Sequence, residues 1–267
     1  MAKTAVLVFF YFGEKSYMNR LAQETVPVGK ALEGYDKAIL LRHKTEVEGY
    51  DLSPKAAALA DVEDLPTREN FVKYLDQLGK EGFTVDVFIF SHGLTDRFTT
   101  SKGEYGQNRP IRAPYIEEHV APLNLRMVWQ CNCYGSSLND TWKKLGAKVT
   151  AGSRFVNFYP TRFRGFIKRW NKGVAFGTAI TKSDTKMSHA PVQGYMLIDA
   201  VDRLEKWNGK IRQVPSILSR RSAAKQYFEG CWLDPGEWFE GKSGRQNMNM
   251  SSHMIVLGDR KITKSSV

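Results

Sequence analysis

Two short motifs supply a histidine and a cysteine pair whose types suit covalent catalysis. His92 stands in a Ser-His-Gly motif at residues 91–93, and Cys131 and Cys133 stand in the motif Gln-Cys-Asn-Cys-Tyr-Gly at residues 130–135. The thiolate is the reactive form of cysteine, and an ordinary thiol with a pKa of about 8.5 is mostly protonated at neutral pH. A nearby imidazole can accept that proton and later protonate a leaving amine. A cysteine and a histidine so placed can therefore work as a nucleophile and its acid–base partner.

The elements expected around the two motifs would bring them together. Apolar runs at 85–90 and 125–130 precede the motifs and predict buried strands. The 133 − 92 = 41 residues between His92 and Cys133 leave room for a hairpin, one helix and one strand, which makes the two strands neighbours. Catalytic sites of parallel sheets lie outside the carboxyl ends of the strands. We therefore predict a site there, with the backbone N–H groups of Gly93 and Cys133 directed at a developing oxyanion.

The rest of the pattern predicts an α/β fold with a mainly parallel central sheet. Short apolar runs alternate with helical spacing, and strands separated by helices form parallel sheets that helices cover on both faces. A small hairpin is expected after the histidine strand, at 97–106, and Thr67 is expected to cap the helix that follows it. Further strands are predicted at 5–12, 37–41 and 254–257, and another runs through Val149; further helices are predicted at 114–121, 137–145 and 200–207.

Nothing in the 267 residues divides the chain, so we expect a single domain, 1–267. No internal repeat, low-complexity tract or linker is found, and the polar stretches 182–194 and 241–252 are expected to be exposed loops. Three cysteines, two of them separated by one residue, fit a reducing compartment better than a disulfide framework. No secretory signal or long apolar span is recognised, so we expect no membrane association and a cytoplasmic location.

Each of these side chains has a purely structural alternative. Histidines at strand ends often serve as hydrogen-bonded structural residues, and buried cysteine packs as a small hydrophobe, as we expect for Cys231. A metal site is not expected, because no second Cys/His pair stands at a zinc spacing from Cys131 and Cys133, and no cofactor is expected either. The remaining histidines are interpreted as surface or structural residues: His43, His119, His189 and His253.

The charge balance raises nucleic acid as a competing partner. Lys and Arg number 39 against 28 Asp and Glu, and this net charge of +11 attracts anionic partners. Between residues 154 and 172, cations interleave with aromatic residues, a pattern that can pair phosphates and stack bases. We favour the alternative that the aromatic residues are core or groove walls and the cations a solvated face. The cluster comprises Arg154, Phe155, Phe158, Tyr159, Arg162, Phe163, Arg164, Phe166, Lys168, Arg169, Trp170 and Lys172.

Four short motifs, in order over about residues 67–153, resemble those of caspase-like cysteine peptidases of clan CD. Pro-Thr-Arg-Glu-Asn-Phe at 66–71 resembles a helix opening of metacaspases, and Val-Phe-Ile-Phe-Ser-His-Gly at 87–93 resembles the caspase histidine strand. Gly-Glu-Tyr-Gly at 103–106 lies where that family has a hairpin. Residues 127–135 are similar to the strand that ends at the caspase nucleophile and to the Cys-Tyr-Ser-Gly of bacterial relatives. The resemblance implies a caspase-like fold and an endopeptidase that acts on proteins or peptides.

The resemblance leaves a choice of nucleophile. Alignment with the caspase strand makes Cys133 the nucleophile and Cys131 a wall of the pocket for the side chain before the scissile bond. A Cys-Asn-Thr-Gly pattern of other clan members would select Cys131 instead, although Tyr134 then stands where glycine belongs. A catalytically silent scaffold that binds a protein partner is a further alternative, but such a scaffold would have no need of both His92 and a cysteine.

The chain also departs from the family pattern. Metacaspases usually have Ser-Gly-His-Gly where this chain has Phe-Ser-His-Gly. Cys131 replaces the Asp of metacaspases and the Gln of caspases, so neither a preference for Arg or Lys nor one for Asp is carried over. We expect that arginine before the scissile bond is not strongly preferred unless an acidic residue such as Asp36 or Asp184 reaches the pocket. No acidic cluster can be matched to the metacaspase calcium site.

Overall fold

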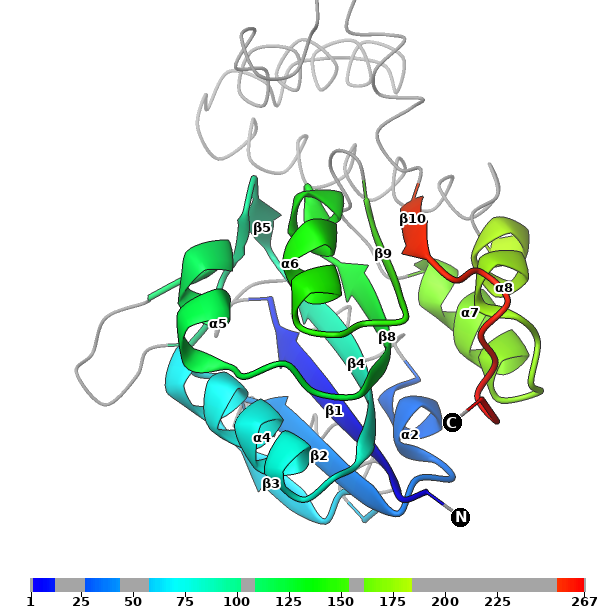
Figure 1. The fold of residues 1–267 in the computed structure, drawn as a ribbon, viewed down its shortest axis with the longest axis horizontal. Helices are drawn as coiled ribbons and strands as arrows, with labels where there is room; N and C mark the ends of the chain where they lie inside the picture. Colours follow the sequence, from blue (N-terminus) through cyan, green and yellow to red (C-terminus); the bar gives the residue numbers. More distant parts are fainter. Residues whose placement is uncertain are drawn as a thin grey trace, which may run out of the picture. The chain divides into compact units, whose positions relative to one another are not determined.

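A seven-stranded sheet forms the centre of the protein. The computed structural model describes residues 2–12, 27–43, 58–101, 109–153, 161–183 and 254–266. The sheet order is β10-β9-β8-β4-β1-β2-β3, and all neighbours are parallel except β10, which runs antiparallel to β9 (Figure 1). The strands are β1 (Thr4–Tyr11), β2 (Lys37–Arg42), β3 (Val62–Asp64), β4 (Thr84–Ser91), β8 (Leu125–Cys131), β9 (Val149–Ser153) and β10 (Met254–Gly258).

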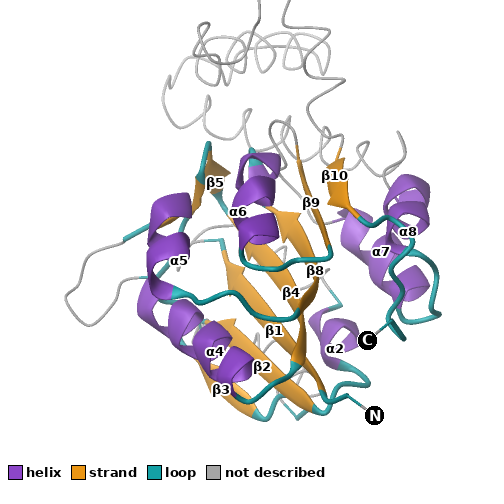
Figure 2. Cartoon of the chain, in the orientation of Figure 1, coloured by secondary structure: helices purple, strands orange, loops and turns teal. Residues whose placement is uncertain are grey.

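Helices cover both faces of this sheet (Figure 2). One face packs against α2 (Val28–Leu32), α7 (Thr161–Trp170) and α8 (Phe176–Ser183). The other packs against α4 (Arg68–Lys80), α5 (Ala113–His119) and α6 (Asn139–Lys144), which a 3₁₀ turn, η1 (Gly135–Leu138), precedes. The predicted α/β fold with a mainly parallel central sheet and helices on both faces is therefore confirmed.

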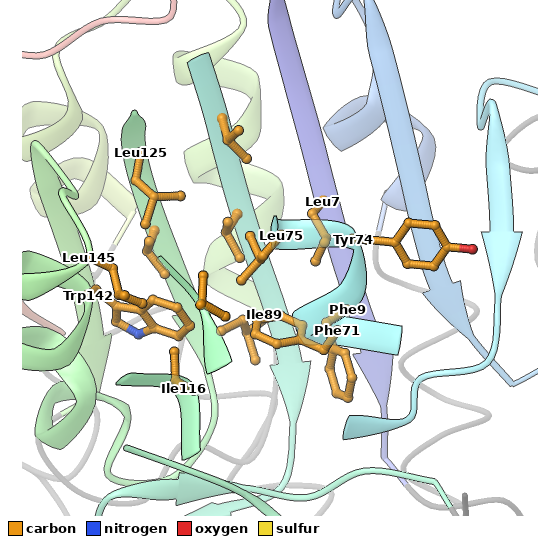
Figure 3. Packing of buried hydrophobic residues seen from close by; sticks show 14 of the residues in the cluster. Leu7, Phe9, Phe71, Tyr74, Leu75, Ile89, Ile116, Leu125, Trp142 and Leu145 are labelled. Atoms are coloured by element: carbon orange, nitrogen blue, oxygen red, sulfur yellow. The ribbon is translucent and has the colours of Figure 1, made fainter. Parts of the chain in front are cut away.

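The central strands are buried on both faces because their side chains alternate between two cores. In β4, Phe88 and Phe90 enter the core on the α7 side, whereas Val87 and Ile89 enter the core on the α4 side. Figure 3 shows this second core, in which Phe71 of α4 and Trp142 of α6 lie over the sheet. The prediction of central strands from uninterrupted apolar runs is therefore confirmed.

Helix α4 begins where the sequence predicts. The Thr67 side chain accepts a hydrogen bond of 3.1 Å from the backbone N–H of Asn70, which confirms the predicted cap. The helix buries Phe71, Leu75 and Leu78, three positions that recur at helical spacing. Because α4 packs over β1 and β4, it helps to fix the strand that carries the histidine motif.

The hairpin after the histidine strand starts earlier than predicted. Strands β5 (Gly93–Leu94), β6 (Arg97–Phe98) and β7 (Ile111–Arg112) form a small antiparallel sheet. The chain reverses directly after residue 94, at a turn in which Asp96 has a φ of 59°. Aspartate tolerates this left-handed conformation better than most residues do, so the turn needs no glycine. Residues 102–108 of the predicted hairpin lie outside the described residues.

Several elements went unpredicted. They are α2, β3, α7 and α8, of which α7 lies in the basic and aromatic stretch. Phe163, Phe166 and Trp170 of α7 are fully buried, so these aromatic side chains belong to the core. Lys182 and Ser183 end α8 rather than begin a loop. The predicted helix at 200–207, the stretch 241–252, the rest of 182–194 and Cys231 lie outside the described residues.

A buried polar cluster fastens the amino edge of the sheet. Arg126 of β8 donates to both carboxylate oxygens of Asp86 of β4, over 2.9 and 2.8 Å. The Tyr35 hydroxyl donates to the same carboxylate over 2.5 Å. Arg126 also donates to the carbonyl oxygens of Lys264 and Ser266, which ties the C-terminal segment to the sheet. Because Asp86 and Arg126 are almost completely buried, these hydrogen bonds offset the desolvation of both charges.

Candidate active site

The two motifs meet at the carboxyl edge of the sheet. Strand β4 pairs with β8 in parallel, and the last registered pair joins Phe90 to Cys131. His92 follows the end of β4, and Cys133 lies two residues after the end of β8. The predicted adjacency of the histidine and cysteine strands is therefore correct, and both side chains belong to the edge where sites of parallel sheets lie.

A glycine brings the two segments into direct contact. A Cβ atom placed on Gly93 would lie 2.6 Å from the carbonyl oxygen of Cys133 and 2.8 Å from Asn132 Nδ2. Ordinary contacts of a Cβ atom begin at 3.4 Å, so no side chain fits there without a shift. The backbone next to His92 therefore packs on the backbone of Cys133 itself.

Cys133 occupies a tight turn between β8 and η1. Tyr134 adopts a left-handed conformation with a φ of 55°, and the N–H of Gly135 donates to the Asn132 carbonyl over 3.2 Å. A second tie comes from Ser137, whose Oγ donates to the Tyr134 carbonyl and accepts from the N–H of Asp96, both over 2.7 Å. The turn that carries Cys133 is thus attached to the hairpin that follows His92.

Two more glycines permit the close approach of β9 to this turn. A Cβ atom on Gly152 of β9 would lie 2.3 Å from the carbonyl carbon of Gly135 and 2.4 Å from the N of Ser136. A Cβ atom on Gly135 would in turn lie 2.8 Å from Asn132 Oδ1. Backbone therefore packs on backbone between β9 and η1, and the Gly135 backbone packs on the Asn132 side chain of the Cys133 turn.

The His92 ring is oriented by a backbone carbonyl. His92 Nε2 lies 3.2 Å from the carbonyl oxygen of Phe12, and the Phe12 ring stands edge-on to the imidazole with centroids 5.6 Å apart. A carbonyl oxygen only accepts, so Nε2 carries the proton in this hydrogen bond and Nδ1 is the nitrogen able to take up another. Although His92 is exposed as a residue, desolvation around its ring lowers the pKa of the imidazole, and the Phe12 carbonyl opposes this effect. The neutral imidazole is therefore favoured.

The two cysteines of the motif differ sharply in environment. Cys131 is fully buried in the core beside α7, whereas Cys133 is partly exposed. Burial raises the pKa of the Cys131 thiol to about 12, against the opposing effect of the buried guanidinium of Arg162, while Cys133 adds to the rise. At neutral pH Cys131 is a protonated thiol without solvent contact. Its predicted place on a pocket wall remains a prediction.

Other predicted residues lie away from this edge or outside the described part. Asp36 accepts from the N–H of Thr4 over 2.7 Å, which places it at the amino edge, so it is wrong as an acid for the pocket. His119 stacks on Tyr115 in α5, with ring centroids 4.0 Å apart. Among the described residues, no group of three or more His, Cys, Asp or Glu side chains could hold a metal ion. Asp184, His189 and His253 lie outside the described residues.

Four contributors to the site escaped the sequence analysis. The Phe12 carbonyl is a backbone group and leaves no signal in residue type. Ser137 and Gly152 act through contacts between segments that no local pattern relates. Asn132 stands between the two cysteines, directly after a buried strand, and a polar residue at that place is the sequence signal that could have identified it.

Comparison of the chain with protein-family models and with curated proteins finds no match. In the part of the chain that the structure describes, no helix is long and apolar enough to cross a membrane. Function is therefore inferred from the residues of the carboxyl edge and their geometry.

Proposed function

We propose that this protein is a cysteine endopeptidase of caspase-like fold, with Cys133 as nucleophile and His92 as acid–base partner. The observation that carries the proposal is the packing of Gly93 on the Cys133 backbone, because it joins the two chemically competent segments at one sheet edge. The parallel pairing of β4 with β8 and the hairpin after the histidine strand agree with a caspase-like arrangement.

The proposed reaction proceeds through an acyl-enzyme. His92 takes the proton of the Cys133 thiol, and the thiolate attacks the carbonyl carbon of the scissile bond. The C–N bond then breaks, the imidazolium gives its proton to the leaving amine, and a thioester remains on Cys133. Water, deprotonated by His92, attacks the thioester and releases the carboxylic acid and the thiol. The N–H groups of Gly93 and Cys133 are the proposed donors to the oxyanion.

Cys133 is the better nucleophile on two grounds. It is partly exposed at the carboxyl edge, whereas Cys131 is fully buried in the core. The raised pKa of Cys131, about 12, leaves almost none of its thiolate at neutral pH. For His92, the hydrogen bond to Phe12 fixes the ring, and its lowered pKa keeps the imidazole ready to accept a proton.

Electrostatics near the cysteine pair disfavour a cationic substrate side chain before the scissile bond. The buried guanidinium of Arg162 acts on the Cys131 thiol, and the predicted acid Asp36 lies at the opposite edge. A buried arginine or lysine of the substrate would need a carboxylate partner to offset its desolvation. We therefore expect that basic residues are not preferred at this position.

The nucleic-acid alternative loses the support that falls on α7, while Arg154, Phe155, Phe158 and Tyr159 of the predicted cluster lie outside the described residues. Stacking on bases requires accessible aromatic faces, and Phe163, Phe166 and Trp170 are fully buried. The exposed cations of α7, Arg164 and Lys168, then form a solvated face. A silent scaffold remains the competing proposal, and it differs from a peptidase in one measurable respect, which is covalent reaction of Cys133 with substrate-like electrophiles.

The deciding experiment is labelling with a panel of peptide electrophiles that vary the residue before the warhead. We expect a covalent adduct on Cys133, located by peptide mass spectrometry, with loss of the adduct in Cys133→Ala and strong slowing in His92→Ala. Cys131→Ala should retain the adduct. Labelling of Cys131 with Cys133 unmodified would overturn the nucleophile assignment, and a panel that labels neither cysteine would favour the scaffold.

A further inference from the structure

Asn132 is the side chain that lies between the two halves of the proposed site. It is 0% exposed, and its Nδ2 makes a long hydrogen bond of 3.4 Å to the carbonyl oxygen of Cys133. Its Oδ1 is buried and accepts no hydrogen bond among the described residues. A buried amide oxygen without a donor costs free energy, and most proteins avoid it.

The surroundings of Asn132 explain why the side chain stays in place. Gly93 contacts it from the hairpin side, where a Cβ atom would lie 2.8 Å from Nδ2 and 3.0 Å from the Asn132 Cβ. Gly135 contacts it from the η1 side, where a Cβ atom would lie 2.8 Å from Oδ1. The carboxamide thus fills the space between the segment that holds His92 and the turn that holds Cys133.

The energetics argue against a stabilising role for this side chain. Its hydrogen bond to Cys133 is near the limit of useful length, and its other polar atom is unsatisfied within the described part of the chain. A small apolar residue would avoid the desolvation cost of the amide. A buried unsatisfied polar group that brings no gain in stability is typical of a functional site.

We propose that Asn132 is a positioning residue, which sets the separation of Cys133 from His92 by filling the space between Gly93 and Gly135. This inference rests on the proposed peptidase function, but it concerns the geometry of the thiol and the imidazole, which can be measured without a substrate. The contact series Gly152, Gly135, Asn132 and Gly93 transmits the position of β9 to the backbone beside His92.

The test measures the alkylation rate of Cys133 by iodoacetamide between pH 5 and 9, resolved from other cysteines by peptide mass spectrometry. With Asn132→Ala we expect the rate at pH 7 to fall by about tenfold or more, because the imidazole no longer stands where it can take the thiol proton. The matched control is Asn124→Ala, which removes an asparagine at the other end of β8 that donates to Thr84. This control should leave the alkylation profile unchanged.

A second variant keeps the shape and changes the charge. Asn132→Asp fills the same space, but its carboxylate disfavours a thiolate on the adjacent Cys133, so the pH of half-maximal alkylation should rise by about one unit or more. If Asn132→Ala does not fold, Asn132→Asp decides. A higher pH of half-maximal Cys133 alkylation supports the positioning role of residue 132, and an unchanged pH overturns it.

The outcomes separate this inference from the peptidase proposal. A folded Asn132→Ala protein with the wild-type alkylation profile would overturn the positioning role, whatever its melting temperature. A profile sensitive to Asn132 in a protein that cleaves no peptide would overturn the peptidase and leave the positioning role supported. In an active protein, the same variant should lower kcat by more than it raises KM.

Discussion

Replacement of Gly93 by alanine should disable the site while the fold survives. The added Cβ atom would stand 2.6 Å from the carbonyl oxygen of Cys133, and ordinary contact begins at 3.4 Å, so the two segments must separate by 3.4 − 2.6 = 0.8 Å. The clash involves backbone, which cannot rotate away as a flexible side chain can. The Cys133 turn and the hairpin therefore have to move apart.

A shift of this size is large for chemistry and moderate for stability. Misplacement by about 1 Å can lower a catalysed rate by about 10²-fold, and overpacking of one methyl group typically costs about 1–3 kcal/mol. We expect Gly93→Ala to lose about two orders of magnitude in the rate of Cys133 labelling by a peptide electrophile. Its free energy of unfolding in urea should fall by an amount within that range.

The control is a glycine whose replacement costs stability at a distance from the site. Gly173 has a φ of 72°, and a Cβ atom added there would meet nothing within 4 Å. Gly173→Ala therefore introduces backbone strain of about 1–2 kcal/mol and no clash. It should label at the wild-type rate. Equal labelling of Gly93→Ala and wild type would refute the inference that Gly93 and Cys133 are in contact.

Three further predictions concern protonation and the amino edge. Desolvation around the ring lowers the imidazole pKa of His92, so the acid limb of the labelling rate should lie below pH 6.5 and should disappear in His92→Gln. A limb above pH 6.5 would contradict this assignment. Arg126→Met leaves Asp86 buried without its partner and should cost about 3–5 kcal/mol in urea unfolding, whereas a loss below about 1 kcal/mol would show that the pair is dispensable. Burial lowers the pKa of Lys264 to about 8, so the unfolded chain binds its proton more tightly and stability should rise from about pH 8 to 10. Lys264→Met should remove roughly 1 kcal/mol of that rise, after allowance for solvent screening, and an identical pH dependence in both proteins would contradict the linkage.

The sheet could be predicted because its signals are local. Runs such as those of β1, β4 and β8 are apolar at most positions, and only strands buried on both faces need that composition. The Thr67 cap could be predicted for the same reason, since a cap is a relation between residues three positions apart. The pairing of the two motif strands and the position of the site at the carboxyl edge then followed from the general behaviour of parallel sheets.

What escaped prediction depends on contacts between distant segments. The aromatic residues of α7 fit a stacking surface as well as a core, and only the packing of Phe163 against Phe90 and Trp129 distinguishes the two, with ring centroids 4.7 and 5.0 Å apart. Asp36 was named as an acidic residue that could reach the pocket, on charge alone, but its hydrogen bonds to Thr4 hold it at the amino edge. Residue type indicates what a side chain can do, and the topology decides where it can do it.

The two edges of the sheet treat polar groups in opposite ways. At the amino edge, both carboxylate oxygens of Asp86 and all three nitrogens of the Arg126 guanidinium make hydrogen bonds. At the carboxyl edge, Asn132 Oδ1 and Ser153 Oγ are buried without a partner among the described residues. A satisfied network at one edge fixes the strands, whereas unsatisfied groups at the other carry a cost that folding alone does not explain. That asymmetry favours the carboxyl edge as the functional one on grounds separate from the cysteine and histidine, because it follows from hydrogen bonding and not from the reactivity of any side chain.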